Sequence, residues 1–162
     1  MRFTRRFVVA GVLSAWVPAL ARAADRLRAD RIVVIKSERR LDLLKDGQVI
    51  RSYPVRLGRH PVGPKIFQFD GRTPEGVYTI DRRSRVSAFH LALHISYPQA
   101  DNVARAAKYN LPAGGAIFIH GTPGTDKRFE RDWTDGCIAV SNRAIEEIWT
   151  LVDNGTPIEI RP

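Results

Sequence analysis

The sequence predicts a mainly β domain with two short helices in its second half, built on a mixed or antiparallel sheet. Short apolar runs rich in Val, Ile and Leu are separated by turns that contain glycine or proline along most of the chain. Asp46-Gly47 lies between two such runs, which indicates a β-hairpin. Strands and helices do not alternate regularly, and this argues against a doubly wound α/β fold.

The first half of the chain is predicted to consist of strands joined by turns. Thr73-Pro74-Glu75-Gly76 is typical of a turn that leads into a strand. Leu57–Gly71 is rich in glycine and proline, so this segment is predicted to be a loop. The expected strands, in order, are Arg31–Ile35, Arg40–Lys45, Gln48–Val55 and Val77–Asp81.

The second half combines strands with two helices. Phe89–Tyr97 alternates between apolar and polar residues, which predicts a strand with His90 and His94 on one face. One helix is expected at Asp101–Tyr109, and a second begins after Ser141-Asn142, which can cap it. The apolar face of the second helix is expected to consist of Ile145, Ile148, Trp149 and Val152. The remaining strands are expected at Ala116–Ile119, Ile138–Val140 and Thr156–Ile160.

Residues 1–23 have the parts of an export signal. A basic start with three arginines precedes an apolar run of about 14 residues, and Ala21-Arg22-Ala23 supplies a cleavage site. An uncleaved anchor is the alternative, but a spanning helix needs roughly 20 apolar residues. We therefore expect a signal peptide over 1–23, with a twin-arginine pattern at Arg5-Arg6. One mature domain over 24–162 would work in the periplasm or another extracytoplasmic space, with no stable membrane span after processing.

The charge of the chain bears on its partners. The signal holds four arginines and no acids, so +5 of the formal net charge of +9 remains on the mature chain. This balance suits work near an anionic polymer or membrane surface, and a solvated basic surface is the alternative. No basic stripe carries interleaved aromatic residues, so nucleic acid is not an expected partner.

Cys137 is the only cysteine, and an odd thiol in an exported protein is either a liability or a reagent. His120 ends a predicted buried strand and is the candidate base, which would bring the thiol pKa below its free value. Gly136 allows a sharp turn, so that the N–H groups of Gly136 and Cys137 could bind an oxyanion. On these residues alone, a small buried cysteine and a core histidine remain the alternative.

Two segments resemble the signature of the L,D-transpeptidase (YkuD-type) catalytic domain. They are Ile119-His120-Gly121 and, after a loop, Thr134-Asp135-Gly136-Cys137-Ile138-Ala139-Val140-Ser141-Asn142. Upstream, GRTPEGVYTI resembles the family's turn into a strand, and RIVVIKSERRLDLLKDGQVIRSYPVRLG resembles its opening hairpin. The resemblance covers most of residues 30–161 and implies a mixed β-sandwich-like domain.

The resemblance implies a cysteine acyltransferase that acts on peptidoglycan stem peptides without a metal or an organic cofactor. Cys137 would attack the carbonyl of the diaminopimelate residue in a stem tetrapeptide and form a thioester as D-alanine leaves. His120 would take the thiol proton and later serve the leaving or incoming amine.

Two departures from the family pattern leave the acyl acceptor open. Asp135 and Ala139 stand where many members carry His and Arg, and TDGCIAVSN is similar to a subgroup that includes a periplasmic hydrolase releasing lipoprotein from peptidoglycan. The alternatives are therefore a hydrolase of the same bonds and a non-catalytic peptidoglycan-binding module. The hydrolase would be an L,D-carboxypeptidase or an amidase that frees protein from peptidoglycan.

Four further residues are candidates for contact with substrate, namely His94, Thr134, Asp135 and His90. The two histidines have partial exposure on a strand as their alternative. They lack a third ligand at suitable spacing and any H-E-x-x-H pattern, so no metal site is expected.

Residues in the loops have weaker claims to a role in the site. Lys65, Arg59 and Thr73 are candidates to meet substrate carboxylates, with loop solvation and turn formation as the alternative. Trp133 either walls the site or anchors its loop in the core. Asn142 is expected to cap a helix rather than to catalyse.

Overall fold

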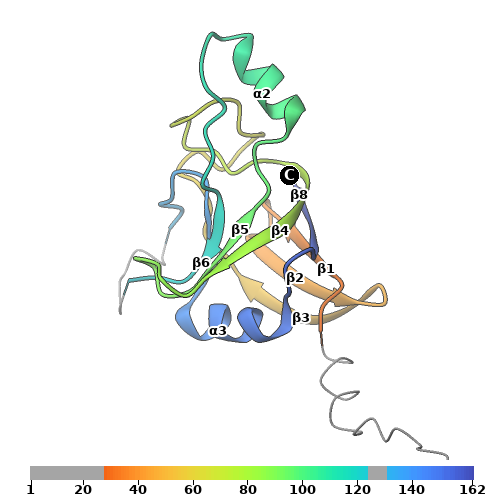
Figure 1. The fold of residues 1–162 in the computed structure, drawn as a ribbon. Coiled ribbons are helices and arrows are strands. Elements are labelled where there is room, and N and C mark those ends of the chain that lie inside the picture. Colours follow the sequence, from red (N-terminus) through yellow and green to blue (C-terminus); the bar gives the residue numbers. More distant parts are fainter. Residues whose placement is uncertain (1–27, 124–130) are drawn as a thin grey trace, which may run out of the picture.

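The computed structural model describes residues 28–123 and 131–162, and the predicted signal peptide lies outside them. The described chain forms one eight-stranded sheet in the order β3-β2-β1-β8-β4-β5-β6-β7 (Figure 1). The β1/β8 and β6/β7 pairs are parallel and the other neighbours are antiparallel, so the sheet is mixed as predicted. The strands are β1 (Arg31–Ile35), β2 (Arg40–Lys45), β3 (Gln48–Pro54), β4 (Gly76–Ser84), β5 (Ala92–Ile95), β6 (Phe118–His120), β7 (Ile138–Ala139) and β8 (Pro157–Arg161).

The predicted hairpin joins β2 to β3. Asp46 and Gly47 have φ angles of 51° and 76°, and two successive positive φ angles are the mark of a type I′ turn. This turn twists in the sense of the strands that flank it, which is why the Asp-Gly pair specifies the hairpin. The strand predictions at β1 and β2 are confirmed to the residue, and the β3 prediction is confirmed except for its last residue.

Strand β4 connects two halves of the sheet. Its first residues, Gly76–Thr79, pair with β8, and its later residues pair with β5. A register shift between Ile80 and Arg82 marks the change of partner, and such an irregularity bends a strand. The β1–β3 half and the β5–β7 half consequently face each other across the core, in agreement with the predicted sandwich-like arrangement (Figure 1).

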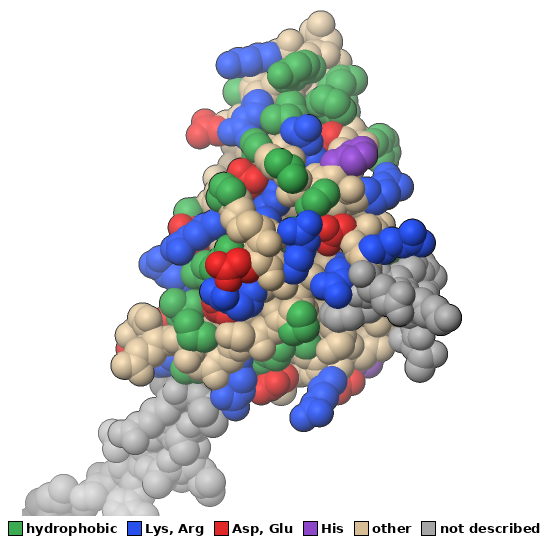
Figure 2. All heavy atoms as spheres, turned by 180° about the vertical axis from the view of Figure 1, so that it is seen from behind, with side chains coloured by type: hydrophobic (Ala, Val, Ile, Leu, Met, Phe, Trp, Pro, Cys, Tyr) green, Lys and Arg blue, Asp and Glu red, His purple; other side chains and the backbone are tan. Residues whose placement is uncertain are grey.

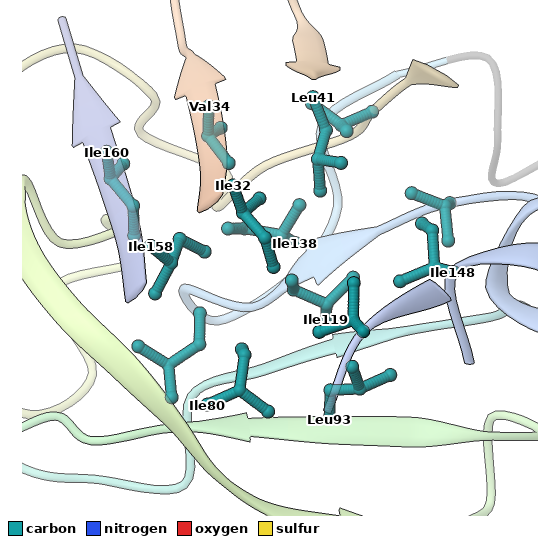
Figure 3. Close-up of a cluster of buried hydrophobic side chains, with 14 of the residues drawn as sticks. Ile32, Val34, Leu41, Ile80, Leu93, Ile119, Ile138, Ile148, Ile158 and Ile160 are labelled. Atoms are coloured by element: carbon teal, nitrogen blue, oxygen red, sulfur yellow. The ribbon is translucent and has the colours of Figure 1, made fainter. Parts of the chain in front are cut away.

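The core between the halves consists largely of branched aliphatic side chains (Figure 3). Ile32 and Ile158 come from one half, and Leu93 and Ile119 from the other, and all four are fully buried. Helix α3 (Asn142–Leu151) lies beneath the sheet in Figure 1 and adds Ile145 and Ile148 to the same cluster. Ser141 is its N-cap and accepts from the Ala144 N–H at 3.2 Å, as the sequence predicted for this segment.

The predicted strand Phe89–Tyr97 is too long at both ends. β5 covers only Ala92–Ile95, and its late start follows from His90, whose φ of 70° lies in the left-handed region that breaks an extended ladder. The other helix, α2 (Ala100–Ala107), agrees with its prediction within two residues. Neither α2 nor α3 has the length or the apolar run that crossing a bilayer requires, and the described ranges contain no other candidate.

Candidate active site

His120 and Cys137 lie on the same face of neighbouring strands. β6 and β7 run parallel, with Ile119 opposite Ile138 and His120 opposite Ala139. Cys137 directly precedes β7, and side chains alternate along a strand. Ile119 and Ile138 therefore turn to the core, whereas His120 and Cys137 turn together to the other side.

The environment of His120 fixes its tautomer. The side chain is buried, and Nδ1 lies 2.6 Å from the carbonyl oxygen of Gly121. A carbonyl only accepts, so Nδ1 carries the proton and Nε2 keeps its lone pair. Phe89 stacks on the imidazole at a centroid distance of 4.6 Å, and Trp133 meets it edge-on at 5.7 Å. Nε2 is thus prepared to accept a proton, with a backbone carbonyl as the orienting group.

Cys137 is a partly exposed residue, and its thiol donates to the carbonyl of Ala116 at 3.5 Å. Ala116 has a φ of 55°, a left-handed conformation that costs energy for a residue with a Cβ and occurs often at functional sites. The carbonyl of Ala116 thus points at the thiol and accepts its S–H proton in a weak hydrogen bond.

Burial keeps both groups of the pair neutral. It raises the pKa of the Cys137 thiol, although the Phe118 backbone opposes this by favouring the thiolate. Burial also lowers the pKa of His120, against the effect of its bond to Gly121. The thiol shift is opposite to the sequence-based expectation. Both shifts favour the uncharged forms, a neutral thiol and a neutral imidazole, in the free site.

The turn before Cys137 is held by Thr134. Its buried hydroxyl accepts from the Gly136 N–H at 3.1 Å and donates to the Cys137 carbonyl at 2.7 Å. Gly136 has a φ of 127°, and a Cβ there would lie 2.6 Å from the Arg72 carbonyl oxygen. Only glycine fits this position. Since Thr134 occupies the Gly136 N–H, the Cys137 N–H remains as the candidate oxyanion donor of this turn.

A neighbouring backbone segment supports the same turn. Arg56 exchanges two backbone hydrogen bonds with Ala139, each 2.8 Å long. Asp132 accepts from the Leu57 N–H at 2.8 Å and from the Arg39 guanidinium at 2.8 and 2.9 Å. The loop after β3 thus fixes the approach to Cys137 from its other side.

Asn142 fixes the segment that follows His120. Its Oδ1 accepts from the Thr122 N–H at 2.8 Å, and a Cβ on Gly121 would lie only 2.3 Å from that oxygen. The capping role expected for Asn142 belongs to Ser141 instead, because Asn142 is already the first residue of α3. The asparagine holds Gly121 in place, and Gly121 in turn holds the imidazole.

The pair opens into a cavity of about 410 Å³, within the range typical of small-molecule sites. The cross-strand register explains its floor, since Ala92 pairs with His120 and residues in register share a face of the sheet. The loop after β4 provides a wall. The lining residues are Arg82, Ser84, Val86, Ser87, Ala88, Phe89, Ala92, Ala116, Phe118, His120 and Cys137.

The two histidines expected on one strand face lie apart. His90 precedes β5, and its Nε2 lies 2.8 Å from Glu146 on α3, away from the cavity lining. His94 pairs in register with Phe118, contacts its ring at a centroid distance of 4.8 Å and binds Asp81 at 2.6 Å. His94 therefore contacts Phe118, a residue of the cavity lining, without lining the cavity itself. His90 lies outside the cavity because the strand is interrupted before β5.

Asp135 and the loop candidates are already engaged with other side chains or with the backbone. Asp135 is exposed and forms an ion pair with Arg59 beside the nucleophile turn. Lys65 is buried against Asp70 at 2.8 Å. Thr73 is buried and accepts from the Gly58 N–H. These contacts organise the loop around Cys137, and of this set only the Arg59–Asp135 pair is open to solvent.

No cluster of three or more His, Cys, Asp or Glu side chains suited to a metal ion occurs in residues 28–123 and 131–162. The chemistry that the described residues support is nucleophilic attack by a thiol with a histidine as base.

A family model described as "YkuD: L,D-transpeptidase catalytic domain" matches residues 29–160. The chain belongs to this family. A curated relative named "Putative L,D-transpeptidase YafK" from Escherichia coli is 33% identical over 129 residues, covering 75% of this chain and 46% of the relative. This chain thus spans about half the length of the curated relatives that it matches.

Solved structures of similar proteins share the fold of this chain. The helical cell shape determining protein Pgp2 from Campylobacter jejuni aligns with a TM-score of 0.64 and 23% identity, over 80% of this chain and 46% of its own. Bd1075 from Bdellovibrio bacteriovorus aligns with a TM-score of 0.57 and 26% identity, again over 80% and 46%. The fold prediction made from the family signature is confirmed.

Several residues of the site were missed by sequence reasoning. Arg82 and the wall around Phe89 have no local signal, because their place depends on the bulge in β4 and the break before β5. The role of Asn142 had a local signal in the sequence. Ser141 directly precedes it and can cap the helix, which leaves the Asn142 side chain for another contact. Trp133, which the sequence left open, packs on the imidazole.

Proposed function

We propose that this domain is a cysteine acyltransferase that remodels peptidoglycan stem peptides through a thioester on Cys137. The observation that carries the proposal is the neutral His120 tautomer, with Nδ1 bound to Gly121, on the same sheet face and cavity as the only thiol. A pure binding module would have no use for this arrangement in an oxidising compartment. Family membership supports peptidoglycan as the substrate.

The catalytic steps follow from the positions of the two groups. The thiol proton passes to Nε2 of His120 as Sγ attacks the carbonyl carbon of diaminopimelate in a stem tetrapeptide. The negative oxygen that forms is stabilised by the Cys137 N–H. The imidazolium then protonates the departing nitrogen, D-alanine leaves, and a thioester remains. An amine or a water molecule, deprotonated by His120, resolves the thioester and restores the thiol.

Transfer to an amine of a second stem peptide is the first candidate outcome, and it is the one that the family's name implies. Hydrolysis is the second, and two observations favour it. Cys137 is a partly exposed residue that lines the cavity, so water that enters the cavity can reach a thioester there. Asp135, with 64% of its side chain exposed, places a carboxylate beside the nucleophile turn where many relatives carry His.

The place of work proposed for the mature chain is the cell wall outside the cytoplasm. The mature formal charge of about +5 suits an anionic polymer. On the face seen in Figure 2, Lys and Arg side chains are spread among hydrophobic and acidic ones and form no single stripe. This spread is compatible with a polymer of separated carboxylates and gives no support to a nucleic-acid track.

Incubation of the purified mature protein with disaccharide-tetrapeptides, followed by mass spectrometry, tests the proposal. Cross-linked dimers identify a transpeptidase, and tripeptides without dimers identify an L,D-carboxypeptidase. A stem peptide joined to the end of a protein by a peptide bond tests the amidase alternative, which predicts release of the protein. Unchanged substrate, together with binding that survives in Cys137→Ser, would show a binding module and overturn the enzymatic proposal.

A further inference from the structure

We propose that Arg82 determines substrate specificity in the Cys137 cavity by binding a carboxylate about 7–8 Å from the carbonyl under attack. In the stem peptide this is the distal carboxylate of diaminopimelate. The inference rests on the proposed function and deepens it, because it names the group by which the acyl donor is recognised.

The cavity has one permanent charge among the residues that the structure describes. Arg82 lines it, and no Asp or Glu side chain does. The other lining side chains are apolar or neutral, apart from the two titratable catalytic groups. A cavity with an arginine and no acid favours an anionic ligand, and the planar guanidinium fits a carboxylate with two parallel hydrogen bonds.

Within residues 28–123 and 131–162, Arg82 has no ion-pair partner, in contrast to the adjacent Arg83. Arg83 lies 3.5 Å from Asp153 and stacks at 4.1 Å over Trp149. The acid next to Arg82 in the chain, Asp81, is bound to His94. Arg82 is an exposed residue, so its guanidinium is available to a ligand, whereas Arg83 and Asp81 are held in contacts within the protein.

The sheet register sets the distance from Arg82 to the thiol. Arg82 pairs with His94, His94 pairs with Phe118, and Cys137 lies at the level of Phe118 on the next strand. Three strand intervals of about 4.8 Å separate the Arg82 and Cys137 backbones by about 14 Å. Side chains on one face of a sheet stand roughly perpendicular to it, so the Arg82 guanidinium and the Cys137 thiol are also about 14 Å apart.

The distal carboxylate of diaminopimelate matches this gap. Six bonds connect the two carboxyl carbons of the residue, a span of about 7–8 Å when extended. An approach of about 3 Å at the thiol and a hydrogen bond of about 3 Å at the guanidinium bring the total to about 13–14 Å. The carboxylate of the departing D-alanine is a second source of the same chemistry, but it lies only about 4 Å from the scissile carbonyl. Arg82 is too far along the sheet to reach it while Cys137 attacks.

The test compares three tetrapeptides with free carboxylates, with the distal carboxylate amidated, and with D-alanine amidated. Binding is measured by calorimetry in the Cys137→Ala background, and turnover is measured with Cys137 present. The variants are Arg82→Gln, Arg82→Lys and the matched control Arg85→Gln, which removes a nearby charge outside the cavity lining. A melting curve for each variant checks that it is folded.

We expect distal amidation to weaken binding to the Arg82 form about tenfold, the low end for a hydrogen-bonded charge because the site is solvated. Arg82→Gln should bind the free and distally amidated substrates alike, Arg82→Lys should keep part of the preference, and Arg85→Gln all of it. In turnover, the loss should appear in KM, since the carboxylate is remote from the reacting atoms.

Two results would overturn the assignment of Arg82 while leaving the proposed function intact. One is equal binding of the free and distally amidated substrates before any mutation. The other is a preference lost on amidation of D-alanine instead, which would assign Arg82 to the leaving residue. Absence of both binding and turnover for every tetrapeptide would overturn the proposed function itself, and the assignment with it.

Discussion

The two halves of the sheet differ in how regular they are. The β1–β3 half has strands of five to seven residues joined by tight turns, whereas β5, β6 and β7 have four, three and two residues. The positive φ angles of the β1–β3 half, at Arg39, Asp46 and Gly47, lie in its two turns, whereas those at His90, Ala116 and Gly136 lie beside the strands that carry His120 and Cys137. The regular half supplies a support, and the irregular half positions the side chains for which we propose a catalytic role.

Within the irregular half, stability and chemistry alternate along each strand. Ile119 and Ile138 are fully buried in the core, and His120 and Cys137 beside them turn to the cavity. Substitutions one residue apart are therefore expected to have separate effects. This expectation gives the comparison its most direct test.

The largest effect is expected from the adjacent pair Cys137→Ala and Ile138→Ala. Cys137→Ala removes the nucleophile, so turnover should fall by at least about 10³-fold while the melting temperature stays the same. Ile138→Ala leaves a core cavity and should cost about 2–5 kcal/mol of unfolding free energy while the folded fraction keeps its turnover. Chemical denaturation and turnover per folded molecule measure both. A comparable loss of stability in both variants would contradict the separation of roles.

A second large effect is expected at Gly136. Gly136→Ala puts a Cβ 2.6 Å from the Arg72 carbonyl at a φ of 127°, so the turn must move. A displaced nucleophile is expected to lower kcat/KM by about 10²-fold. Gly47→Ala is the matched control in the regular half, since it too has a positive φ but no atom lies within 4 Å of the added Cβ. It should lose stability by about 1 kcal/mol and keep its kcat/KM. Equal kcat/KM in the two variants would mean that the turn geometry is not needed.

The pH dependence of acylation should sharpen the same picture. Only neutral His120 accepts a proton, and burial lowers its pKa from the ordinary 6.5. Activity is therefore lost only as pH falls through this lowered value, so the midpoint of the acid limb of kcat/KM should lie below 6.5. The raised pKa of Cys137 predicts that alkylation by iodoacetamide increases only above about pH 9, the ordinary value of the thiol. A thiolate that titrates near neutral pH would instead indicate a preformed ion pair.

The sequence predicted the regular half closely because periodicity and the Asp46-Gly47 turn are local signals. A resemblance to a family signature also singled out His120 and Cys137, which line one cavity, and their roles as base and nucleophile stay predictions. The sequence did not indicate Arg82, the wall at Phe89 or the break at His90, because these depend on a bulge and on pairing between distant strands. The engagement of the Gly136 N–H by Thr134 was likewise out of reach, since the residue types alone do not assign a hydrogen bond.

The smallest separable effect is expected at Ser141 and Asn142, two neighbours at the start of α3. Ser141→Ala removes the helix cap and should cost about 1 kcal/mol of stability without changing kcat. Asn142→Ala leaves the Thr122 N–H without its acceptor and loosens Gly121, whose carbonyl holds His120. We expect a similar loss of stability, about 1–3 kcal/mol, together with a fall of about tenfold in kcat. Asn142→Asp keeps an oxygen for Thr122 and should restore most of kcat. If Asn142→Ala changed stability alone, as Ser141→Ala does, the orientation of His120 would not depend on the chain of contacts from α3.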